Sequence, residues 1–340
     1  MNVRWGIIGT GYMARIFASD LDHAEHGSRA AVASRQADRA AAFAADLAVP
    51  AAYGNAEDLI ADPAVDAVYV ATPHTAHAHW ALRAIEEGKP VLCEKPLATD
   101  PDQIRQVVEA ARRADVFLME GFMYRLHPQT ELVAELVERG ELGEVRQIRA
   151  SFANDAEPDP AHRLFAPALG GGAIHDLGCY PMSVARLLAG RAAGLPRAEP
   201  EELAGAGHLG PTGVDEAAAA LLRFPNGITA QLTTGLTLPA ERGLRIDGTR
   251  GSILVPDPWS CGRPGEIIAP GEHYGTGEIR LLTEAGDKTL AVESDQPLFA
   301  LEADHVAACL RGGLTQSPLL PWADTVGNGQ ALHQWRAAIG

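Results

Sequence analysis

The sequence predicts an α/β protein with two domains. These are an N-terminal doubly wound parallel sheet and a C-terminal α+β domain whose open sheet is mainly antiparallel. Within residues 1–122, short apolar runs alternate with helical patterns, as strands and helices do in a doubly wound sheet. From residue 145 onward, short strand-like segments follow one another, and Pro225-Asn226-Gly227 separates two of them like a hairpin turn. We therefore expect domains at residues 1–122 and 123–340.

The composition is that of an ordinary globular protein: 46% of the 340 residues are hydrophobic, enough for two cores. A net charge of −16 argues against nucleic acids and anionic membrane surfaces as partners. The four cysteines stand far apart and form no C-x-x-C pair, which suits a reducing compartment. No apolar stretch approaches the ~20 residues of a membrane span, and no basic leader opens the chain. We expect a cytoplasmic protein.

The first apolar run, Val3 to Ile8, is expected to be a buried strand that leads into a glycine-rich turn and a helix. The turn reads Gly9-Thr10-Gly11-Tyr12-Met13-Ala14, the G-x-G-x-x-A form of the dinucleotide fingerprint. Gly9 would permit the tight turn, and Gly11 would let the backbone approach a pyrophosphate at the helix N-terminus. This setting predicts a Rossmann domain. Its expected cofactor contacts here are Gly9, Thr10, Gly11, Tyr12 and Met13.

The second predicted strand, residues 29–34, ends without the acidic residue that usually holds the ribose 2′-hydroxyl of NAD. Ser34 and Arg35 stand there instead, and Arg39 follows one helical turn later. A planar guanidinium suits a 2′-phosphate, so the sequence favours NADP. In the alternative, both arginines are solvated and Asp38 plays the acidic role, which would leave NAD possible.

Later strands are predicted at residues 66–71, 90–93 and 116–119. Thr72, Pro73 and His74 follow the first of these, at the sheet edge where ligands of doubly wound folds bind. We expect these three residues to line the cofactor crevice and His77 to cap or border it. A metal site built from the nearby histidines is not expected, because their spacing scatters them around a helix start and no acidic or cysteine partner is near.

The run Val91-Leu92-Cys93-Glu94-Lys95-Pro96-Leu97 places a carboxylate and an ammonium where a buried strand ends. Lys95 is the only lysine between Lys89 and Lys288. A lysine at this edge can lie in the ligand crevice, whereas the alternative is a surface ion pair with Glu94. A helix is predicted to begin next, with Asp100 as its cap and Pro101 in its first turn.

In the second domain, Gly170-Gly171-Gly172 feeds a helix that carries Asp176 and Tyr180. Residues four apart share a face of an α-helix, so a carboxylate and a phenol would lie together and could move a proton. In the alternative, Asp176 caps the helix and Tyr180 is a core aromatic. The segment 190–213, rich in Ala, Gly, Pro and Glu, is expected to be a surface connection. The other expected elements are a helix at 128–139 and strands at 145–152, 217–224, 228–234, 244–248 and 252–255.

Taken in order, Gly9 to Ala14, Cys93 to Pro96 and the triple-glycine stretch to Tyr180 resemble the Gfo/Idh/MocA family of oxidoreductases. The resemblance covers nearly the whole chain. Residues 120–128 and 169–180 look most like the branch of NADP-dependent D-xylose dehydrogenases, dimeric dihydrodiol dehydrogenases and glucose–fructose oxidoreductase.

By position, the resemblance implies that Lys95 and Asp176 are catalytic. Tyr180 stands where the inositol dehydrogenases carry histidine, as it does in the branch named above. Arg163 stands where that branch places an arginine near the cofactor. His74 and His175 depart from residues common in the family, so the substrate stays open.

These residues predict reversible hydride transfer between nicotinamide C4 and a carbon that bears a hydroxyl, in a sugar or related polyol. Tyr180 would be the general acid/base. Because a free phenol has a pKa of about 10, a cation such as Lys95 would have to lower it. Asp176 would orient the pair or a substrate hydroxyl, and Glu94 would form a wall of the nicotinamide site. Lys95 or His175 are the alternative proton carriers.

The sequence leaves two other functions open. One is an enzyme that reduces a C=N or C=C bond or acts on a dihydrodiol. Another is a regulator that binds the cofactor without catalysis. Because one face of an antiparallel sheet needs cover, the sequence also suggests a homodimer or homotetramer.

Overall fold

The structure, a computed structural model, describes residues 2–239, 242–262 and 275–340. These residues form two compact units. Of the described residues, unit 1 contains 2–126 and 295–326, and unit 2 contains 127–239, 242–262, 275–294 and 327–340. Residues 295–326 thus cluster with the N-terminal unit, although the sequence pattern suggests a second domain that includes them.

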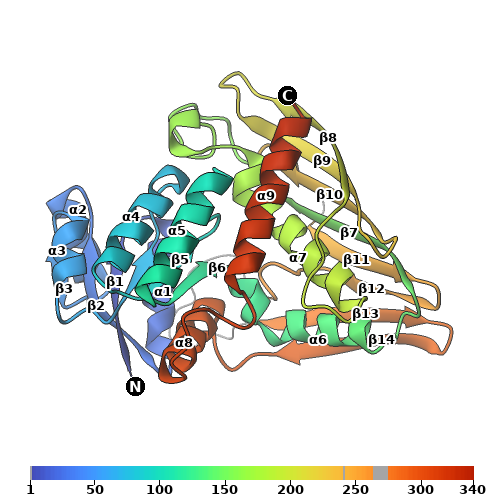
Figure 1. The fold of residues 1–340 in the computed structure, drawn as a ribbon, viewed down its shortest axis with the longest axis horizontal. Coiled ribbons are helices and arrows are strands. Elements are labelled where there is room, and N and C mark those ends of the chain that lie inside the picture. The colour runs from blue at the N-terminus through green and yellow to red at the C-terminus, as the bar shows by residue number, and fades with distance from the viewer. Residues whose placement is uncertain (1, 240–241, 263–274) are drawn as a thin grey trace. The chain divides into compact units, whose positions relative to one another are not determined.

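Unit 1 is built on a parallel sheet of six strands in the order β3-β2-β1-β4-β5-β6, within the described part of the chain (Figure 1). The chain starts in the middle, winds to one edge and then to the other, so the predicted doubly wound sheet is confirmed. The strands are β1 (Val3–Ile8), β2 (Gly27–Ala33), β3 (Ala51–Tyr53), β4 (Ala67–Val70), β5 (Val91–Glu94) and β6 (Leu118–Gly121). The helices before residue 122 are α1 (Tyr12–Asp20), α2 (Ala37–Asp46), α3 (Ala56–Ala61), α4 (His74–Glu86) and α5 (Pro101–Ala114).

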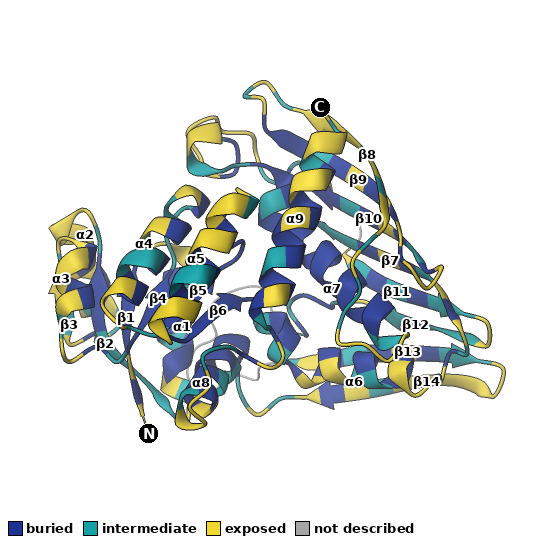
Figure 2. Cartoon of the chain, viewed as in Figure 1, coloured by how far each residue is buried: buried dark blue, intermediate teal, exposed yellow. Residues whose placement is uncertain are grey.

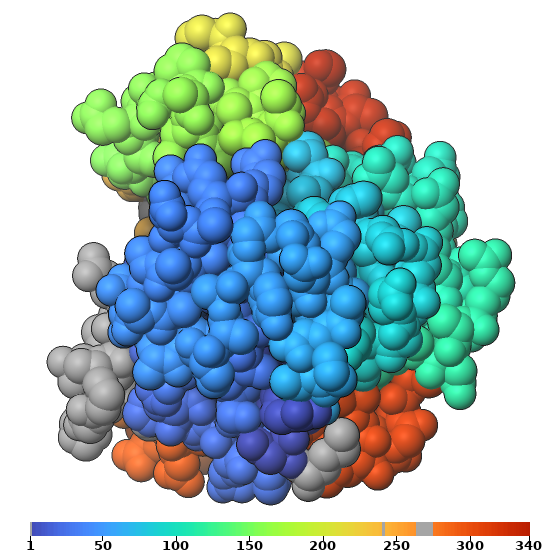
Figure 3. Space-filling model, turned by 90° about the vertical axis from the view of Figure 1, so that its left-hand side faces the viewer, coloured from blue at the N-terminus to red at the C-terminus, as the bar shows by residue number. Residues whose placement is uncertain are grey.

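Strands β4, β5 and β6 are buried along their whole length, although β6 lies at the edge of the sheet (Figure 2). Their sequences are short apolar runs because helices cover both faces of a sheet of this kind, leaving no face for polar side chains. In the space-filling view, the N-terminal residues of the unit, coloured blue to cyan, make one continuous outer surface (Figure 3). The carboxyl ends of these buried strands carry Glu94 and Gly121.

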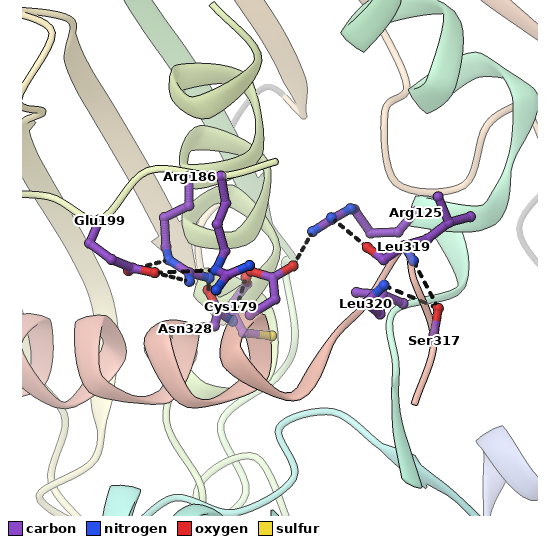
Figure 4. A network of polar contacts seen from close by, with 10 residues as sticks. Arg125, Cys179, Arg186, Glu199, Ser317, Leu319, Leu320 and Asn328 are labelled. Carbon is purple, nitrogen blue, oxygen red and sulfur yellow. Dashed lines mark hydrogen bonds and ion pairs between the residues drawn. The ribbon is translucent and has the colours of Figure 1, made fainter. Parts of the chain in front are cut away.

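Residues 295–326 belong to unit 1 because they satisfy groups at the edge of its sheet. The Leu118 amide donates to the Thr315 carbonyl at 3.0 Å, and the Trp322 indole donates to the Leu118 carbonyl at 3.0 Å. The buried Arg125 guanidinium pairs with Asp324 at 3.0 Å and donates to the Leu319 carbonyl (Figure 4). The segment contains α8 (Leu298–Arg311) and the start of α9 (Trp322–Ala338).

Unit 2 is built on a sheet of eight described strands in the order β14-β13-β12-β11-β7-β10-β9-β8 (Figure 1). Only β7 and β10 pair in parallel; the other pairs are antiparallel, which confirms the predicted mainly antiparallel sheet. The strands are β7 (Val145–Ala153), β8 (Glu202–Leu209), β9 (Asp215–Arg223), β10 (Thr229–Gly235), β11 (Gly243–Gly248), β12 (Gly251–Val255), β13 (Thr276–Thr283) and β14 (Gly286–Glu293). The helices of this unit are α6 (Pro128–Glu138), α7 (Cys179–Arg191) and most of α9.

Strand β8 corrects one expectation, because it lies inside the segment 190–213 that the composition suggested was a surface connection. Its small residues hide the strand signal. A Cβ on Gly205 would lie 3.1 Å from Ala338, and one on Gly207 would lie 2.9 Å from Ile339. The strand therefore uses glycine so that the end of the C-terminal helix can pack closely on it. Strands β13 and β14 were likewise not foreseen.

Helix α7 is buried along nearly its whole length and carries the fully buried Arg186. That guanidinium pairs with Glu199 at 2.6 Å and lies 3.5 Å from the Asn328 amide oxygen (Figure 4). All four cysteines are buried, and none of them forms a disulfide within the described part of the chain. Among the described residues, no helix combines the length and apolar character that crossing a bilayer requires.

Candidate active site

The glycine-rich turn of unit 1 has the geometry that its sequence predicts. Gly9 has φ +118°, and a Cβ there would lie 2.4 Å from the Ala71 carbonyl oxygen, so only glycine fits. Gly11 caps helix α1, and nothing lies within 4 Å of the point where its Cβ would be. The backbone at the start of α1 is thus open to an approaching group. Tyr12 is 56% exposed, and Thr10 and Met13 are partly exposed.

At the end of β2, the guanidinium groups predicted to hold a 2′-phosphate stand free in solvent. Arg35 and Arg39 are exposed, and neither forms an ion pair within the described part of the chain. The Ser34 hydroxyl accepts a hydrogen bond from the Gln36 amide at 3.3 Å, which fixes the turn between strand and helix. Asp38, the acidic alternative, lies in the first turn of α2.

The loop after β4 contains a hydroxyl that no described protein group satisfies. The Thr72 Oγ1 atom is buried and lacks a hydrogen-bond partner among the described residues. An unsatisfied buried hydroxyl costs free energy unless something else pairs with it. This orphaned group, the open backbone at Gly11 and the unpaired Arg35 and Arg39 fit a bound dinucleotide phosphate. Pro73 is partly exposed and His74 is buried.

His77 bridges the two loops that carry the predicted cofactor and catalytic residues. Its Nδ1 atom lies 2.8 Å from the Pro96 carbonyl oxygen, and its Nε2 atom lies 2.7 Å from the Thr72 carbonyl oxygen. Burial, helped by neighbouring His74, lowers the pKa of His77 to about 3, so its ring is neutral and its one N–H donates to only one of these two carbonyl oxygens. Both ring nitrogens face the protein backbone. This geometry places His77 between the two loops, and its expected position at the border of the cofactor crevice stays a prediction.

Lys95 and Glu94 stand at the end of β5, and both are buried. The Tyr69 hydroxyl donates to Glu94 Oε1 at 2.6 Å, and the Lys95 amide donates to Glu94 Oε2 at 3.3 Å. Burial raises the pKa of Glu94, while the Lys95 ammonium opposes that rise. Glu120 from β6 accepts the Leu97 amide at 2.9 Å and so fixes the chain after the lysine.

A second buried carboxyl, Glu302 of α8, lies beside this strand end. Its Oε1 atom is 3.5 Å from the point where a Cβ on Gly121 would lie. Neither oxygen has a hydrogen-bond partner among the described residues, and burial together with Glu94 raises its pKa well above 4.5. Sequence reasoning missed Glu302 and Tyr69, because nothing local marks either as a neighbour of Glu94.

In unit 2, Asp176 lies on a π-helical turn, Ile174–Gly178, directly before α7. Such turns are rare and occur often at functional sites. The α-helical spacing assumed from the sequence for Asp176 and Tyr180 is therefore wrong in detail, since the chain between them is wound more loosely. Asp176 is buried at 4% exposure, and His175 beside it is partly exposed.

Arg163 pairs with the carboxylate of Asp176, Nη1 to Oδ1, at 2.9 Å. The Arg163 side chain is 45% exposed, whereas that of Asp176 is 6% exposed. One end of the pair thus reaches solvent and the other is enclosed. The guanidinium orients the buried carboxylate, a role that the sequence did not assign to Arg163.

Tyr180 is enclosed by aromatic rings. Its ring meets Phe152 edge-on at 5.1 Å and Trp259 at 5.8 Å between centroids, and Phe152 stacks on Trp259 at 5.6 Å. The Trp259 indole donates to the Ser151 carbonyl at 2.9 Å, which fixes that ring. Phe152 and Trp259 were not singled out from the sequence, because they come from a strand and a loop far from Tyr180.

The predicted site residues therefore fall into two groups. Lys95 and the expected cofactor contacts other than Arg163 belong to unit 1, whereas Arg163, Asp176 and Tyr180 belong to unit 2. No cluster of three His, Cys, Asp or Glu side chains placed to hold a metal occurs among the described residues.

Comparisons with known proteins agree with this geometry. Residues 3–122 match the model of an oxidoreductase family with a NAD-binding Rossmann fold, and residues 130–254 match the Gfo/Idh/MocA C-terminal domain. The trans-1,2-dihydrobenzene-1,2-diol dehydrogenase of Mus musculus is 33% identical over 343 residues, which cover 100% of this chain and 98% of that protein.

Solved structures with the same fold span the whole chain. A 3-ketoreductase from Actinomadura kijaniata, in complex with NADP and TDP-benzene, has a TM-score of 0.85 at 27% identity, over 100% of this chain and 98% of that one. An aldose-aldose oxidoreductase from Caulobacter crescentus, complexed with glycerol, has a TM-score of 0.84 at 24% identity, over 99% and 97% of the two chains.

Proposed function

Because the chain belongs to the Gfo/Idh/MocA family of oxidoreductases, we propose that it is an NADP(H)-dependent enzyme acting on CH–OH donors. It would transfer hydride between nicotinamide C4 and a hydroxyl- or carbonyl-bearing carbon of a sugar or related polyol. The observation that carries this proposal is the enclosed carboxylate of Asp176, held by Arg163 at 2.9 Å on a π-helical turn next to Tyr180. A structural cap would need neither the guanidinium nor the π-helical turn.

When bound, the cofactor supplies the hydride acceptor or donor. The Tyr180 hydroxyl takes the substrate proton as the carbonyl forms and returns it in the reverse direction. Its ring packs against Phe152 and Trp259, which hold the phenol oxygen in place. Lys95 would supply the positive charge that favours the phenolate and a hydrogen bond to the reacting oxygen.

The preference for NADP rests on Ser34, Arg35 and Arg39. Both guanidinium groups lack ion-pair partners within the described chain, so phosphate binding breaks no existing pair. The 3-ketoreductase neighbour was solved with NADP, which agrees with this assignment. Asp38 is exposed in the first turn of α2, so an NAD-like contact is the competing outcome.

A second substrate class has its own observation. The partly exposed ring of Phe152 lies edge-on to Tyr180 and offers an apolar surface, which suits the face of a substrate ring more than a wholly polar sugar. The mouse relative is a dihydrodiol dehydrogenase, so a cyclic trans-diol is the alternative to a sugar.

The test is absorbance at the reduced-nicotinamide band with NADP and with NAD. The substrate panel contains aldoses, inositols, deoxy-keto sugars and a trans-dihydrodiol. We expect turnover of at least one polyol, with NADP preferred over NAD by about tenfold. A tenfold preference for NAD contradicts the Arg35 argument, and turnover of the dihydrodiol alone moves the assignment to the second class. No turnover at all favours a cofactor-binding regulator.

We also infer that the open face of the unit 2 sheet joins copies of the chain. The cross-strand partners Leu221, Gln231, Arg149, Arg245 and Leu254 form one row across five strands and point to the same face. Leu221 in this row is 52% exposed. Light scattering after size-exclusion chromatography tests this: a homodimer or homotetramer is expected, and Leu221→Lys should shift it towards the monomer.

A further inference from the structure

We propose that Asp215, the first residue of β9, is a positioning residue for Asp176. The inference rests on the proposed function, because it assigns Asp215 the task of holding the turn on which Asp176 acts. Asp215 is 1% exposed, and its Oδ2 atom accepts the Ile174 amide at 2.6 Å. Ile174 opens the π-helical turn and stands two residues before Asp176. The carboxylate thus holds the reactive turn at its first amide.

The turn needs this outside contact because it has no cap of its own. Ala173 occupies the N-cap position and offers no side-chain hydrogen bond. The first amides of a helical turn have no partner within the turn and attract negative charge. A carboxylate from a strand 41 positions away in sequence does the work of a local cap.

The third glycine of the motif, Gly172, leaves the space that the Asp215 carboxylate occupies. Gly172 has φ +122°, and a Cβ on it would lie 2.5 Å from Asp215 Oδ1. Any larger residue would push the carboxylate off the Ile174 amide. Position 171 requires glycine for a different reason, because a Cβ there would lie 2.5 Å from the Leu164 carbonyl oxygen. The triple glycine is therefore shaped in part by Asp215.

The neighbouring strand holds the same turn from its carbonyl side. The Thr234 hydroxyl of β10 donates to the Ala173 carbonyl at 3.2 Å, and Thr234 is fully buried. Since Thr234 pairs with Ala218 across the two strands, β9 and β10 together hold the single peptide group between Ala173 and Ile174, the carboxylate at its N–H and the hydroxyl at its carbonyl. The sheet sets the position of the turn.

Packing alone does not explain a buried carboxyl group here. Burial raises the pKa of Asp215, and the Ile174 amide and the Arg336 guanidinium, at 3.3 Å, oppose that rise. A buried carboxylate is costly, and an apolar residue of similar size is often as good for stability. What the carboxylate adds is a fixed geometry for the turn that carries Asp176.

The test compares Asp215→Ala, Asp215→Asn and Gly172→Ala with wild type. A displacement of about 1 Å at a reacting group can cost about 10²-fold in rate, so Asp215→Ala should lower kcat by about that factor. The dissociation constant of NADPH, measured by fluorescence, should stay within about twofold, because the predicted nucleotide contacts of the glycine turn lie in unit 1. The active fraction is normalised to the NADPH-binding stoichiometry.

Asparagine keeps the shape and one acceptor oxygen, so Asp215→Asn should recover kcat to within about tenfold of wild type. Gly172→Ala should behave like Asp215→Ala although it leaves the carboxylate in place. The matched control is Asp304→Ala, which removes a carboxylate that accepts the Glu25 and His26 amides at 2.8 and 2.7 Å in unit 1. It should lower the melting temperature without changing kcat per active site.

Hydrogen exchange gives a readout that needs no substrate. In Asp215→Ala, the amides of residues 174–180 should exchange faster than in wild type, while those of β1 and β4 should not change. If wild type turns over no substrate but this exchange pattern appears, the proposed function fails and the holding role stands. Wild-type kcat with unchanged exchange in Asp215→Ala or, should that variant not fold, in Gly172→Ala overturns the inference.

Discussion

Replacing Glu302 by glutamine should stabilise the protein at neutral and alkaline pH. Glu302 is fully buried, and neither oxygen has a hydrogen-bond partner among the described residues. Burial and the neighbouring Glu94 raise the pKa of Glu302 well above 4.5. The folded protein therefore keeps this carboxyl neutral at pH values where the unfolded chain ionises it. Glutamine has nearly the same shape and no proton to lose.

The sign of the pH dependence follows from the raised pKa. Between pH 4.5 and the folded-state pKa, the unfolded chain has released a proton that the folded protein keeps. The free energy of unfolding therefore falls as pH rises, by up to about 1.4 kcal/mol per pH unit from this one group. Near pH 7.5, about three units above the ordinary value, the loss reaches at most about 4 kcal/mol. Glu302→Gln removes that loss.

Urea unfolding of wild type and Glu302→Gln, followed at several values from about pH 5.5 to about pH 8.5, measures the effect. The two free energies should diverge steadily as pH rises. The control is Glu109→Gln, which neutralises a partly exposed carboxylate of α5 that pairs with Arg112 at 2.9 Å. It should run parallel to wild type. A constant difference between Glu302→Gln and wild type at every pH would show that Glu302 is ionised in the folded protein and refute the reasoning.

Three further predictions concern the cofactor, the reaction and stability. Replacing Arg35 and Arg39 together by alanine should lower kcat/KM for NADP about 30-fold, at about 1 kcal/mol per exposed guanidinium. The value for NAD should not change, and an unaltered NADP/NAD ratio contradicts the assignment. Lys95→Ala should bind NADPH yet lose at least about 10² in kcat, whereas full turnover would remove Lys95 from the mechanism. Burial lowers the pKa of His127 from 6.5 to about 4, so its neutral form stabilises the fold above pH 6.5 and stability falls as pH drops towards 4. In His127→Asn, the asparagine can still cap the helix but does not titrate. The free energy of unfolding, measured with urea, should therefore fall by about 1 kcal/mol less than in wild type between about pH 7.5 and about pH 5.8.

The parts of the fold that could be predicted are those fixed by local chemistry. The apolar run at Val3–Ile8 needs cover on both faces, and it forms a strand with those bounds. Asp100 and Pro101 begin α5 as cap and first-turn residue, as expected. Residues 295–326 could not be assigned in this way. Their place in unit 1 depends on single contacts such as Trp322 to the Leu118 carbonyl, which no local pattern marks.

The same division holds inside the candidate site. The sequence indicated that the segment from Gly172 to Tyr180 is functional, but it did not predict the geometry of its turn. Gly178 shows why: a Cβ there would lie 3.1 Å from the Trp335 ring and 3.2 Å from Thr234. Asp215, Thr234 and Trp335 come from three elements that close on the turn only in the folded unit. A helical pattern read from neighbours in sequence predicts α-helical spacing, because it contains none of these contacts. The geometry of the loosely wound turn thus depends on the sheet that packs against it. Substitutions in that sheet should therefore displace Asp176 more than substitutions at its neighbours in sequence do.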